Sequence, residues 1–291
     1  DLSNIISEEE IANLEEELPF VETKDILAAL SNKIISNIDR EAIEFFANSA
    51  VAKIWHHTFI NEKAALRQLS ECPPDTYSQE VKSRFLEQYK GAKNLDIPLG
   101  YSFKVNGELS PPNLMQRFTA FMMKTRKRLG NWSGTGAGKT LSAILSSRVV
   151  DARFTLICCP NSVVGGWKNN IEAIYPDSAV FSKDTKITLS PNKHCYLILN
   201  YEFFQQPQSE NKLKNLVEKQ KIDFVVIDEI HYSKQRVVDD ISKRKKVISA
   251  LLSEAAKKND NLHVLGMSAT PVINNLFEGK TLIELITGVL H

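Results

Sequence analysis

The stretch Ser133-Gly-Thr-Gly-Ala-Gly-Lys-Thr140 decides the fold of this chain. It follows a short run that contains Leu129 and Trp132 and precedes an apolar periodic segment that starts at Leu141, so we expect it between the end of a strand and the start of a helix. Glycines let consecutive backbone amides converge on one phosphate, and the N-terminus of the following helix adds the positive end of its dipole. The stretch therefore predicts a phosphate-binding loop.

The residues of this loop predict contacts with ATP and Mg²⁺. Lys139 supplies a point charge for the β- and γ-phosphates, and the hydroxyl of Thr140 is placed to ligate Mg²⁺. The expected nucleotide-binding residues are Gly134, Thr135, Gly136, Ala137, Gly138, Lys139 and Thr140. The strict pattern has glycine at position 133, where this chain has Ser133. An ordinary glycine-rich turn is the alternative, but the Gly-Lys-Thr ending and the strand-to-helix context favour the phosphate loop.

An acidic pair follows a second apolar run. Phe224-Val-Val-Ile227 is an uninterrupted β-branched and aromatic run, typical of a strand buried on both faces of a parallel sheet. Such sheets bind ligands at the carboxyl ends of their strands, so we expect Asp228 to reach the Mg²⁺ shell and Glu229 to polarise the attacking water. Two carboxylates after a strand can also begin a solvated loop, and the phosphate loop in the same chain favours the catalytic interpretation.

The order of the phosphate loop, Asp228-Glu-Ile-His231 and Ser268-Ala-Thr270 resembles motifs I, II and III of superfamily 2 helicases and translocases. The resemblance covers roughly residues 110–291. Three further segments are similar to motif Ia, motif Ib and the Asn-Asn continuation of the Swi/Snf-type branch: 154–167, 196–202 and 271–276. That branch usually has an acidic residue ahead of the phosphate loop and a Gly-Thr-Pro form of motif III, whereas this chain has Ser133 and Ser-Ala-Thr-Pro.

The resemblance implies roles for residues outside the phosphate loop. It makes His231, Ser268 and Thr270 the link between the nucleotide site and a nucleic-acid track, and it makes Gln116 the residue that recognises adenine. A glutamine amide can donate and accept at once, which matches the N6 donor and N7 acceptor of adenine. A solvated helix residue is the alternative for Gln116, and a buried structural histidine is the alternative for His231. The implied nucleic-acid contacts are Pro160, Asn161, Asn200 and Tyr201.

Strand and helix patterns alternate after residue 110, which predicts a parallel sheet covered on both sides. The candidate strands lie near 128–132, 154–159, 179–182, 195–200, 223–227 and 262–267. The fold class is therefore α/β, and the resemblance implies a RecA-like P-loop NTPase lobe over residues 96–291. Residues 1–95 are expected to form a mainly α-helical accessory domain, which includes a helix over 79–90. A small hairpin is expected around Asn106-Gly107.

Charge separates the two parts of the chain. Residues 1–100 hold 10 Lys and Arg against 18 Asp and Glu, a net −8, whereas residues 101–291 hold 26 against 17, a net +9. A basic ATPase part suits a polyanionic track. Two basic clusters stand out, one at Lys124, Arg126, Lys127 and Arg128 and one at Lys243 to Lys246, although such clusters are also common on solvated helix faces.

Composition excludes several classes of protein. The chain has 291 residues, 43% hydrophobic and 24% charged, and no apolar run approaches the roughly 20 residues that span a bilayer. The start lacks the features of a secretory signal, and the four cysteines form no Cys-x-x-Cys pair, so we expect reduced structural thiols rather than a zinc site. The expected location is intracellular, cytoplasmic and nucleoid-associated in a prokaryote or nuclear in a eukaryote, without a membrane partner.

Together these features predict the ATP-binding part of a DNA helicase or translocase, with ATP and Mg²⁺ as cofactors and double-stranded DNA as the first-choice partner. The chain ends about twenty residues after motif III, so we expect a second RecA-like lobe elsewhere in the full-length protein. That lobe would supply an arginine finger worth roughly 10³ to 10⁵ in turnover, and this part alone should bind ATP weakly and hydrolyse it poorly. The alternatives are an RNA helicase, a restriction-system motor subunit, or a catalytically idle ATP-binding switch or docking lobe.

Overall fold

The computed structural model describes residues 70, 74–183, 185, 187–188, 190, 192–233, 242–271 and 276–289. The chain divides into two units, Asp1–Phe85 and Leu86–His291, and each is considered by itself. Most of the helical domain expected over residues 1–95 lies outside the described residues, as do Cys72 and most of the segment 271–276. The expected domain boundary at residue 95 stays a prediction.

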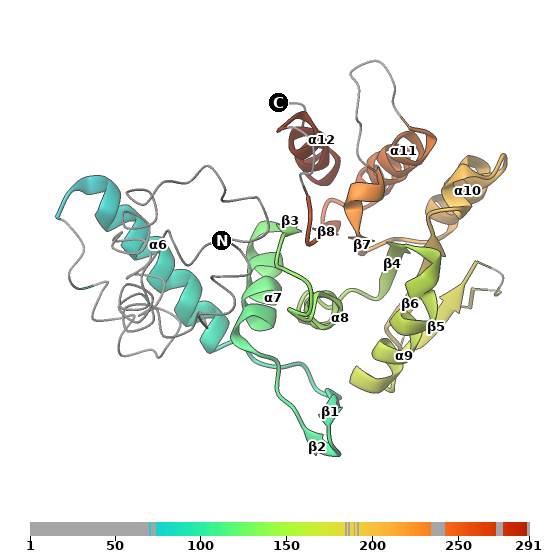
Figure 1. Ribbon diagram of the computed structural model, residues 1–291. Coiled ribbons are helices and arrows are strands. Elements are labelled where there is room, and N and C mark those ends of the chain that lie inside the picture. Colours follow the sequence, from blue (N-terminus) through green and yellow to red (C-terminus); the bar gives the residue numbers. More distant parts are fainter. Residues whose placement is uncertain are drawn as a thin grey trace, which may run out of the picture. The chain divides into compact units, whose positions relative to one another are not determined.

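A six-stranded sheet forms the centre of the second unit, and all of its pairings are parallel. Its strand order is β3-β8-β7-β4-β6-β5 (Figure 1). The strands are β3 (Arg128–Asn131), β4 (Phe154–Cys159), β5 (Ala179–Ser182), β6 (Cys195–Asn200), β7 (Phe224–Asp228) and β8 (His263–Met267). Each of the six predicted strands is present within one or two residues of its expected bounds, and the RecA-like α/β fold is confirmed.

Helices cover both faces of the sheet (Figure 1). One face packs on α7 (Leu114–Arg126), α8 (Lys139–Val149) and α9 (Val164–Ile174), and the other on α10 (Ser209–Lys219), α11 (Lys243–Lys258) and α12 (Leu276–Thr287). Three short 3₁₀ helices follow strand ends: η2 (Asn161–Val163), η3 (Phe203–Gln205) and η4 (Ile230–Ser233). Because β4, β6 and β7 are buried along their whole length, their sequences are apolar without alternation, as expected for strands covered on both sides.

Among the described residues, a helix and a small hairpin precede α7 and the first strand of the sheet. Helix α6 (Thr76–Lys93) contains the helix predicted over 79–90. The predicted hairpin is formed by β1 (Lys104–Val105) and β2 (Glu108–Leu109), which pair antiparallel. Its two turn residues, Asn106 and Gly107, both have positive φ, as a tight two-residue hairpin turn requires.

The cysteines of the sheet are buried and free. Neighbouring Cys158 and Cys159 lie in the hydrophobic clusters on opposite faces of β4, because successive side chains of a strand point to opposite faces. Burial raises the pKa of the Cys159 thiol to about 12. Among the residues that the structure describes, no group of three or more His, Cys, Asp or Glu side chains could hold a metal ion. Within the same residues, every helix is too short or too polar to span a bilayer.

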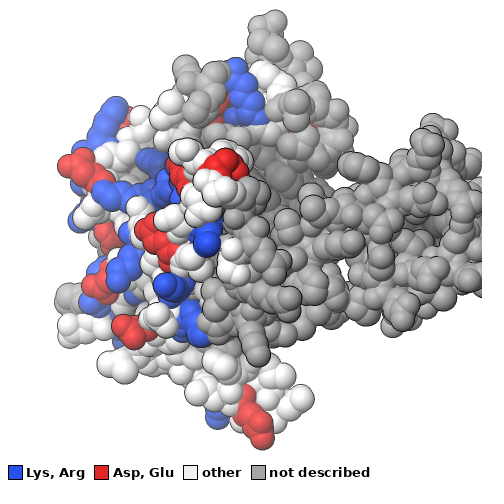
Figure 2. Space-filling model, turned by 90° about the vertical axis from the view of Figure 1, so that its left-hand side faces the viewer, with Lys and Arg blue, Asp and Glu red and all other residues white. Residues whose placement is uncertain are grey.

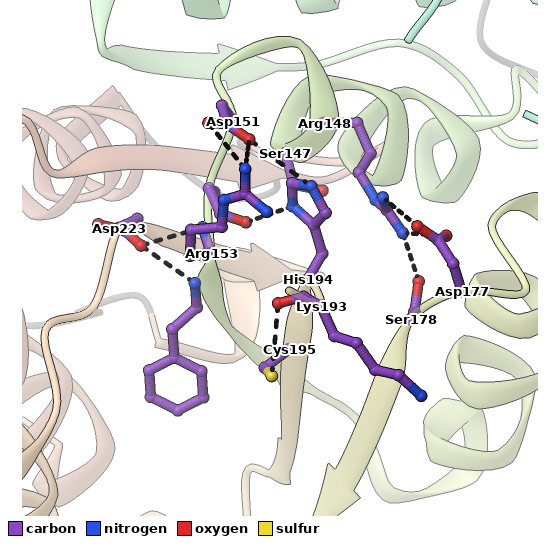
Figure 3. Close-up of polar contacts among 12 residues, drawn as sticks. Ser147, Arg148, Asp151, Arg153, Asp177, Ser178, Lys193, His194, Cys195 and Asp223 are labelled. Carbon is purple, nitrogen blue, oxygen red and sulfur yellow. Dashed lines mark hydrogen bonds and ion pairs between the residues drawn. The ribbon is translucent and has the colours of Figure 1, made fainter. Parts of the chain in front are cut away.

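A polar network ties the amino ends of the strands together (Figure 3). The guanidinium of Arg148, at the end of α8, donates to both carboxylate oxygens of Asp177 at 2.7 and 3.2 Å. Asp223, just before β7, accepts from two consecutive amides at the start of β4 at 3.0 Å. Nδ1 of His194, just before β6, lies 2.8 Å from the carbonyl oxygen of Ala152. These contacts fix the amino edge of the sheet, opposite to the edge where the phosphate loop lies.

Candidate active site

Strand order brings the three predicted motifs to one edge of the sheet. The phosphate loop follows β3, the acidic pair ends β7, and Ser268 follows β8, which lies between them. The register makes this alignment close, since Asn131 and Asp228 are both opposite Met267. Motifs that are separated by about ninety residues in the sequence therefore emerge side by side.

The phosphate loop connects β3 to α8 in a conformation that depends on glycine. Gly136 and Gly138 have φ values of 77° and 78°, in the left-handed region that other residues rarely adopt. Gly138 is the N-cap of α8 and has no side chain to cap the amides of the first helical turn. Those amides are available for an anion, as a phosphate cradle requires.

Lys139 lies across its own loop. Its ammonium group donates to the carbonyl oxygens of Ser133 and Gly134, both at 2.9 Å. The carboxamide oxygen of Asn131 accepts from the amide of Ser133 at 3.1 Å and from its hydroxyl at 2.7 Å. A glycine at position 133 would keep the first of these two bonds and lose the second. The departure from the strict pattern thus adds a contact that anchors the start of the loop.

Gln116 lies against the phosphate loop rather than in solvent. It is 8% exposed, and it forms a capping box with Asn113 at the start of α7, with both bonds at 2.9 Å. Its carboxamide is so close to Gly138 that a Cβ atom on this glycine would collide with it. The solvated alternative for Gln116 is therefore wrong, while its contact with adenine stays a prediction.

Asp228 is 9% exposed and is held by two buried aromatic side chains. The indole N–H of Trp167 donates to its Oδ2 at 2.8 Å, and the hydroxyl of Tyr201 donates to its main-chain oxygen at 2.7 Å. Burial raises the pKa of the Asp228 carboxyl above its usual value, and the charge of Glu229 adds to this, whereas the Trp167 bond and the charge of Lys139 oppose it. The two hydrogen bonds hold Asp228 at the carboxyl edge of the sheet, the edge where the phosphate loop lies.

Motifs II and III are in direct contact. Nδ1 of His231 lies 3.2 Å from Oε2 of Glu229 and 2.9 Å from the hydroxyl oxygen of Ser268. That hydroxyl donates to Oε2 of Glu229 at 3.3 Å and accepts from the amide of Thr270 at 3.0 Å. Glu229 has a positive φ of 49°, an uncommon conformation for glutamate. A change at His231 or Ser268 would therefore alter the position of the Glu229 carboxylate, which is expected to orient water.

The residues expected to contact nucleic acid lie on two neighbouring loops. Asn200, at the end of β6, donates from its side-chain amide to the side-chain oxygen of Asn161 in η2 at 2.8 Å. Pro160 is half-buried and Asn161 is exposed. The expectation that Tyr201 contacts nucleic acid requires correction: its ring is 1% exposed and its hydroxyl is bonded to Asp228, so it supports the surface from behind.

The two basic clusters lie at different edges of the sheet. Lys127 donates to the side chain of Asn261 at 2.8 Å and Arg128 to the last turn of α12, which places the first cluster at the amino edge. Lys243 and Arg244 donate to η3, which follows β6 at the carboxyl edge. Figure 2 shows basic and acidic side chains interspersed on the described surface that it displays.

Trp167 and Asn131 form contacts in the site that were not predicted from the sequence. Trp167 ends the segment that is similar to motif Ia, and it is separated from Asp228 by 61 residues. Asn131 is the last residue of β3. Their places at a strand end and on a helix were predictable from the sequence. Their contacts were not, because the partners are brought to them by the tertiary fold.

The site suits a magnesium nucleotide. A Cβ atom at Gly134 or Gly136 would meet nothing within 4 Å, so the loop borders open space. The hydroxyl of Thr140 and the carboxylate of Asp228 are oxygen ligands, which Mg²⁺ prefers. With the amides of the loop and the Lys139 ammonium, the donor set is that of a phosphate and cation site.

A parallel sheet with a phosphate loop after one strand and an acidic pair after a neighbouring strand defines a RecA-like P-loop lobe. Residues 71–273 match the model of the family described as "Type III restriction enzyme, res subunit", and the chain belongs to this family. This assignment confirms the resemblance to superfamily 2 helicases and translocases.

A curated relative and a solved structure are similar to this chain. The "SWI/SNF-related matrix-associated actin-dependent regulator of chromatin subfamily A-like protein 1 homolog" of Caenorhabditis elegans is 30% identical over 157 residues, 52% of this chain. The "Sulfolobus solfataricus SWI2/SNF2 ATPase core in complex with dsDNA" is 19% identical, with a TM-score of 0.48 over 66% of this chain. The matches span 20% of the length of the relative and 38% of the solved chain.

Proposed function

We propose that this chain is the ATP-binding first lobe of a nucleic-acid-dependent ATPase that couples ATP hydrolysis to movement on DNA. One observation carries the proposal: the Lys139 loop, the acidic pair and motif III meet at the carboxyl edge of one sheet, where Glu229 contacts both His231 and Ser268. Ligands of open α/β sheets bind at this edge.

The residues of the site divide the work of binding and hydrolysis. The loop amides and Lys139 hold the β- and γ-phosphates, and Thr140 and Asp228 hold the metal. Mg²⁺, when bound, neutralises charge that develops on the phosphate oxygens. Glu229 orients and polarises the attacking water. His231, Ser268 and Thr270 link Glu229 to the part of the lobe that contacts the track. Gln116 recognises adenine beside the loop.

Double-stranded DNA is the proposed track. The names of the matched family and of the worm relative, a restriction enzyme and a chromatin regulator, favour DNA over RNA. Exposed Asn161 lies on a loop at the same edge as Lys243 and Arg244, and residues 101–291 carry a net charge of +9. A polar loop beside cations is suited to phosphate backbones.

The complete motor requires a second RecA-like lobe, which would close on this one and supply an arginine finger. We therefore propose weak ATP binding and slow hydrolysis by this chain alone. The proposed setting is intracellular, because the DNA track and reduced cysteines belong there.

Binding and turnover measured side by side test this function. A fluorescent ATP analogue should bind with an affinity that rises on addition of Mg²⁺. Lys139→Ala should abolish binding, whereas Lys104→Ala, on the exposed hairpin, should bind as the wild type does. Hydrolysis should be slow in this chain and stimulated by duplex DNA when the second lobe is joined to it.

Three results would contradict the proposal. If the Lys139→Ala protein bound the ATP analogue as tightly as the wild type, the proposed nucleotide site would be wrong. If RNA stimulated ATP hydrolysis more strongly than duplex DNA at the same salt concentration, RNA rather than DNA would be the track. Nucleotide binding without turnover in the two-lobe protein would identify an idle switch or docking lobe instead of a motor.

A further inference from the structure

Asp228 is contacted by side chains from both loops that are expected to meet the track. Trp167 lies on α9, which begins directly after η2, and η2 contains Asn161. Tyr201 directly follows Asn200. The two loops are themselves joined by the hydrogen bond between Asn161 and Asn200. Each loop thus sends one aromatic side chain to the same acidic residue.

The two bonds restrain different parts of Asp228. The Trp167 bond, at 2.8 Å, holds Oδ2 of the carboxylate, and the Tyr201 bond, at 2.7 Å, holds the main-chain oxygen. An indole has one N–H and can only donate, so the bond has a fixed direction. With Oδ2 held, rotation of the carboxylate is restricted, and the oxygen that can meet a cation at the phosphate loop is determined in advance.

Burial makes the Trp167 bond specific. The side chain is 2% exposed and packs in the hydrophobic cluster between α8, α9 and the sheet. A phenylalanine would fill much of this space, but it would leave Oδ2 without its indole donor. Packing alone therefore does not account for tryptophan at this position, since an apolar ring of any kind would serve it.

We propose that Trp167 is a positioning residue for the magnesium-nucleotide site, where its indole N–H orients the Asp228 carboxylate before the ligand arrives. Tyr201 fixes the peptide of the same residue. This inference rests on the proposed function, because it concerns the same nucleotide site. Partners that orient a metal ligand typically account for 10-fold to 100-fold in metal affinity.

The same contacts provide a route from the track to the nucleotide. Asn161 precedes α9, which carries Trp167, and Asn200 precedes Tyr201 in the chain. Each loop is therefore connected to Asp228 by one hydrogen bond. The route is distinct from the contact of motif III with Glu229, which acts on the water rather than on the metal ligand.

The test compares Trp167→Phe with Trp132→Phe, which removes an indole that is 37% exposed. The affinity of a fluorescent ADP analogue is measured over a range of Mg²⁺ concentrations and in EDTA. Trp167→Phe should raise the Mg²⁺ concentration needed for half of the metal-dependent gain in affinity by about 10-fold. Binding in EDTA should stay the same, and Trp132→Phe should match the wild type in both conditions.

A second readout uses the protein without nucleotide or metal. In ¹⁵N-labelled protein the indole signal of Trp167 is the one that disappears in the Trp167→Phe variant. Asp228→Ala removes the acceptor and should shift this signal, whereas the signal of Trp132 should stay in place. This measurement decides the matter even where the Trp167→Phe protein does not fold, because the signal can then be assigned by elimination with Trp132→Phe and Trp55→Phe.

The outcomes separate this inference from the proposed function. A wild-type protein without Mg²⁺-dependent nucleotide binding would overturn both. If the wild type binds in that manner and Asp228→Ala does not, the function stands. An unchanged Mg²⁺ requirement in Trp167→Phe, or an unmoved indole signal in Asp228→Ala, would then overturn the role of Trp167 alone.

Discussion

Three glycines of the phosphate loop form a graded series for substitution by alanine. Gly134 has an ordinary φ and open space at the position of a Cβ atom. Gly136 has a φ of 77° and the same open space, so alanine there adds strain without collision. Gly138 has a φ of 78°, and its Cβ atom would collide with the carboxamide of Gln116. The series separates backbone strain from overlap.

The structure sets the expected size of each effect. Gly134→Ala should change the free energy of unfolding little, by less than about 0.5 kcal/mol. Gly136→Ala should lower it by about 1 kcal/mol, the cost of the left-handed conformation. Gly138→Ala should lower it by about 2 kcal/mol, because displacement of Gln116 also breaks a capping bond worth about 1 kcal/mol.

Thermal unfolding followed by circular dichroism measures these differences. For a lobe of this size about 1 kcal/mol corresponds to a shift in Tm of about 2 to 4 °C, so Gly138→Ala should unfold about 4 to 8 °C below the wild type. In a Gln116→Ala background the Gly138→Ala and Gly136→Ala shifts should become equal, since the collision is gone. Equal shifts in the wild-type background would refute the packing of Gln116 on Gly138.

Three further predictions concern catalysis, the amino edge of the sheet and pH. Glu229→Gln in the two-lobe protein should lower turnover by about 10² to 10⁴ and leave ATP affinity unchanged, as measured by steady-state kinetics and equilibrium binding. Arg148→Met should lower the free energy of unfolding in urea by about 2 to 3 kcal/mol, because the Arg148 side chain is 3% exposed and its charged hydrogen bonds to Asp177 are lost. Arg153→Met, which breaks an exposed pair, should lower it by less than about 1 kcal/mol. Burial lowers the pKa of His194 below its usual value of 6.5, so the unfolded chain takes up the proton first as pH falls. Its contribution to stability is complete above pH 6.5 and declines below it, and His194→Gln should make Tm fall less steeply between pH 7 and pH 5; an unchanged slope would contradict this.

Local sequence patterns predicted much of the fold. The central strands β4, β6 and β7 were predictable because each is a short, buried and mainly apolar run, as at 154–159 and 195–200. The phosphate loop was predictable because eight consecutive residues provide both the glycines that its conformation requires and the positive charge of Lys139. The hairpin at Asn106-Gly107 was predictable for the same reason, since two neighbouring residues determine its turn.

The candidate site was predictable as a set of residues but not as a set of contacts. Lys139 begins the helix after β3, and Asp228 and Glu229 lie at the end of β7; the order of the strands brings these positions to one edge. The prediction for Tyr201 was wrong because sequence alone does not show whether a residue after a strand faces solvent or turns inward. Its hydroxyl turned out to hold Asp228 from within the fold.

The sequence by itself determined the loop that can hold a phosphate, the strands that form the sheet and the acidic pair at the end of one of them. These are local properties, because each depends on residues that are adjacent in the chain. Only the tertiary structure decided that Trp167 donates to Asp228, that Gln116 packs on Gly138 and that Glu229 meets motif III. Those contacts join residues that are far apart in the chain, and they exist because the parallel sheet places the carboxyl ends of its strands at one edge.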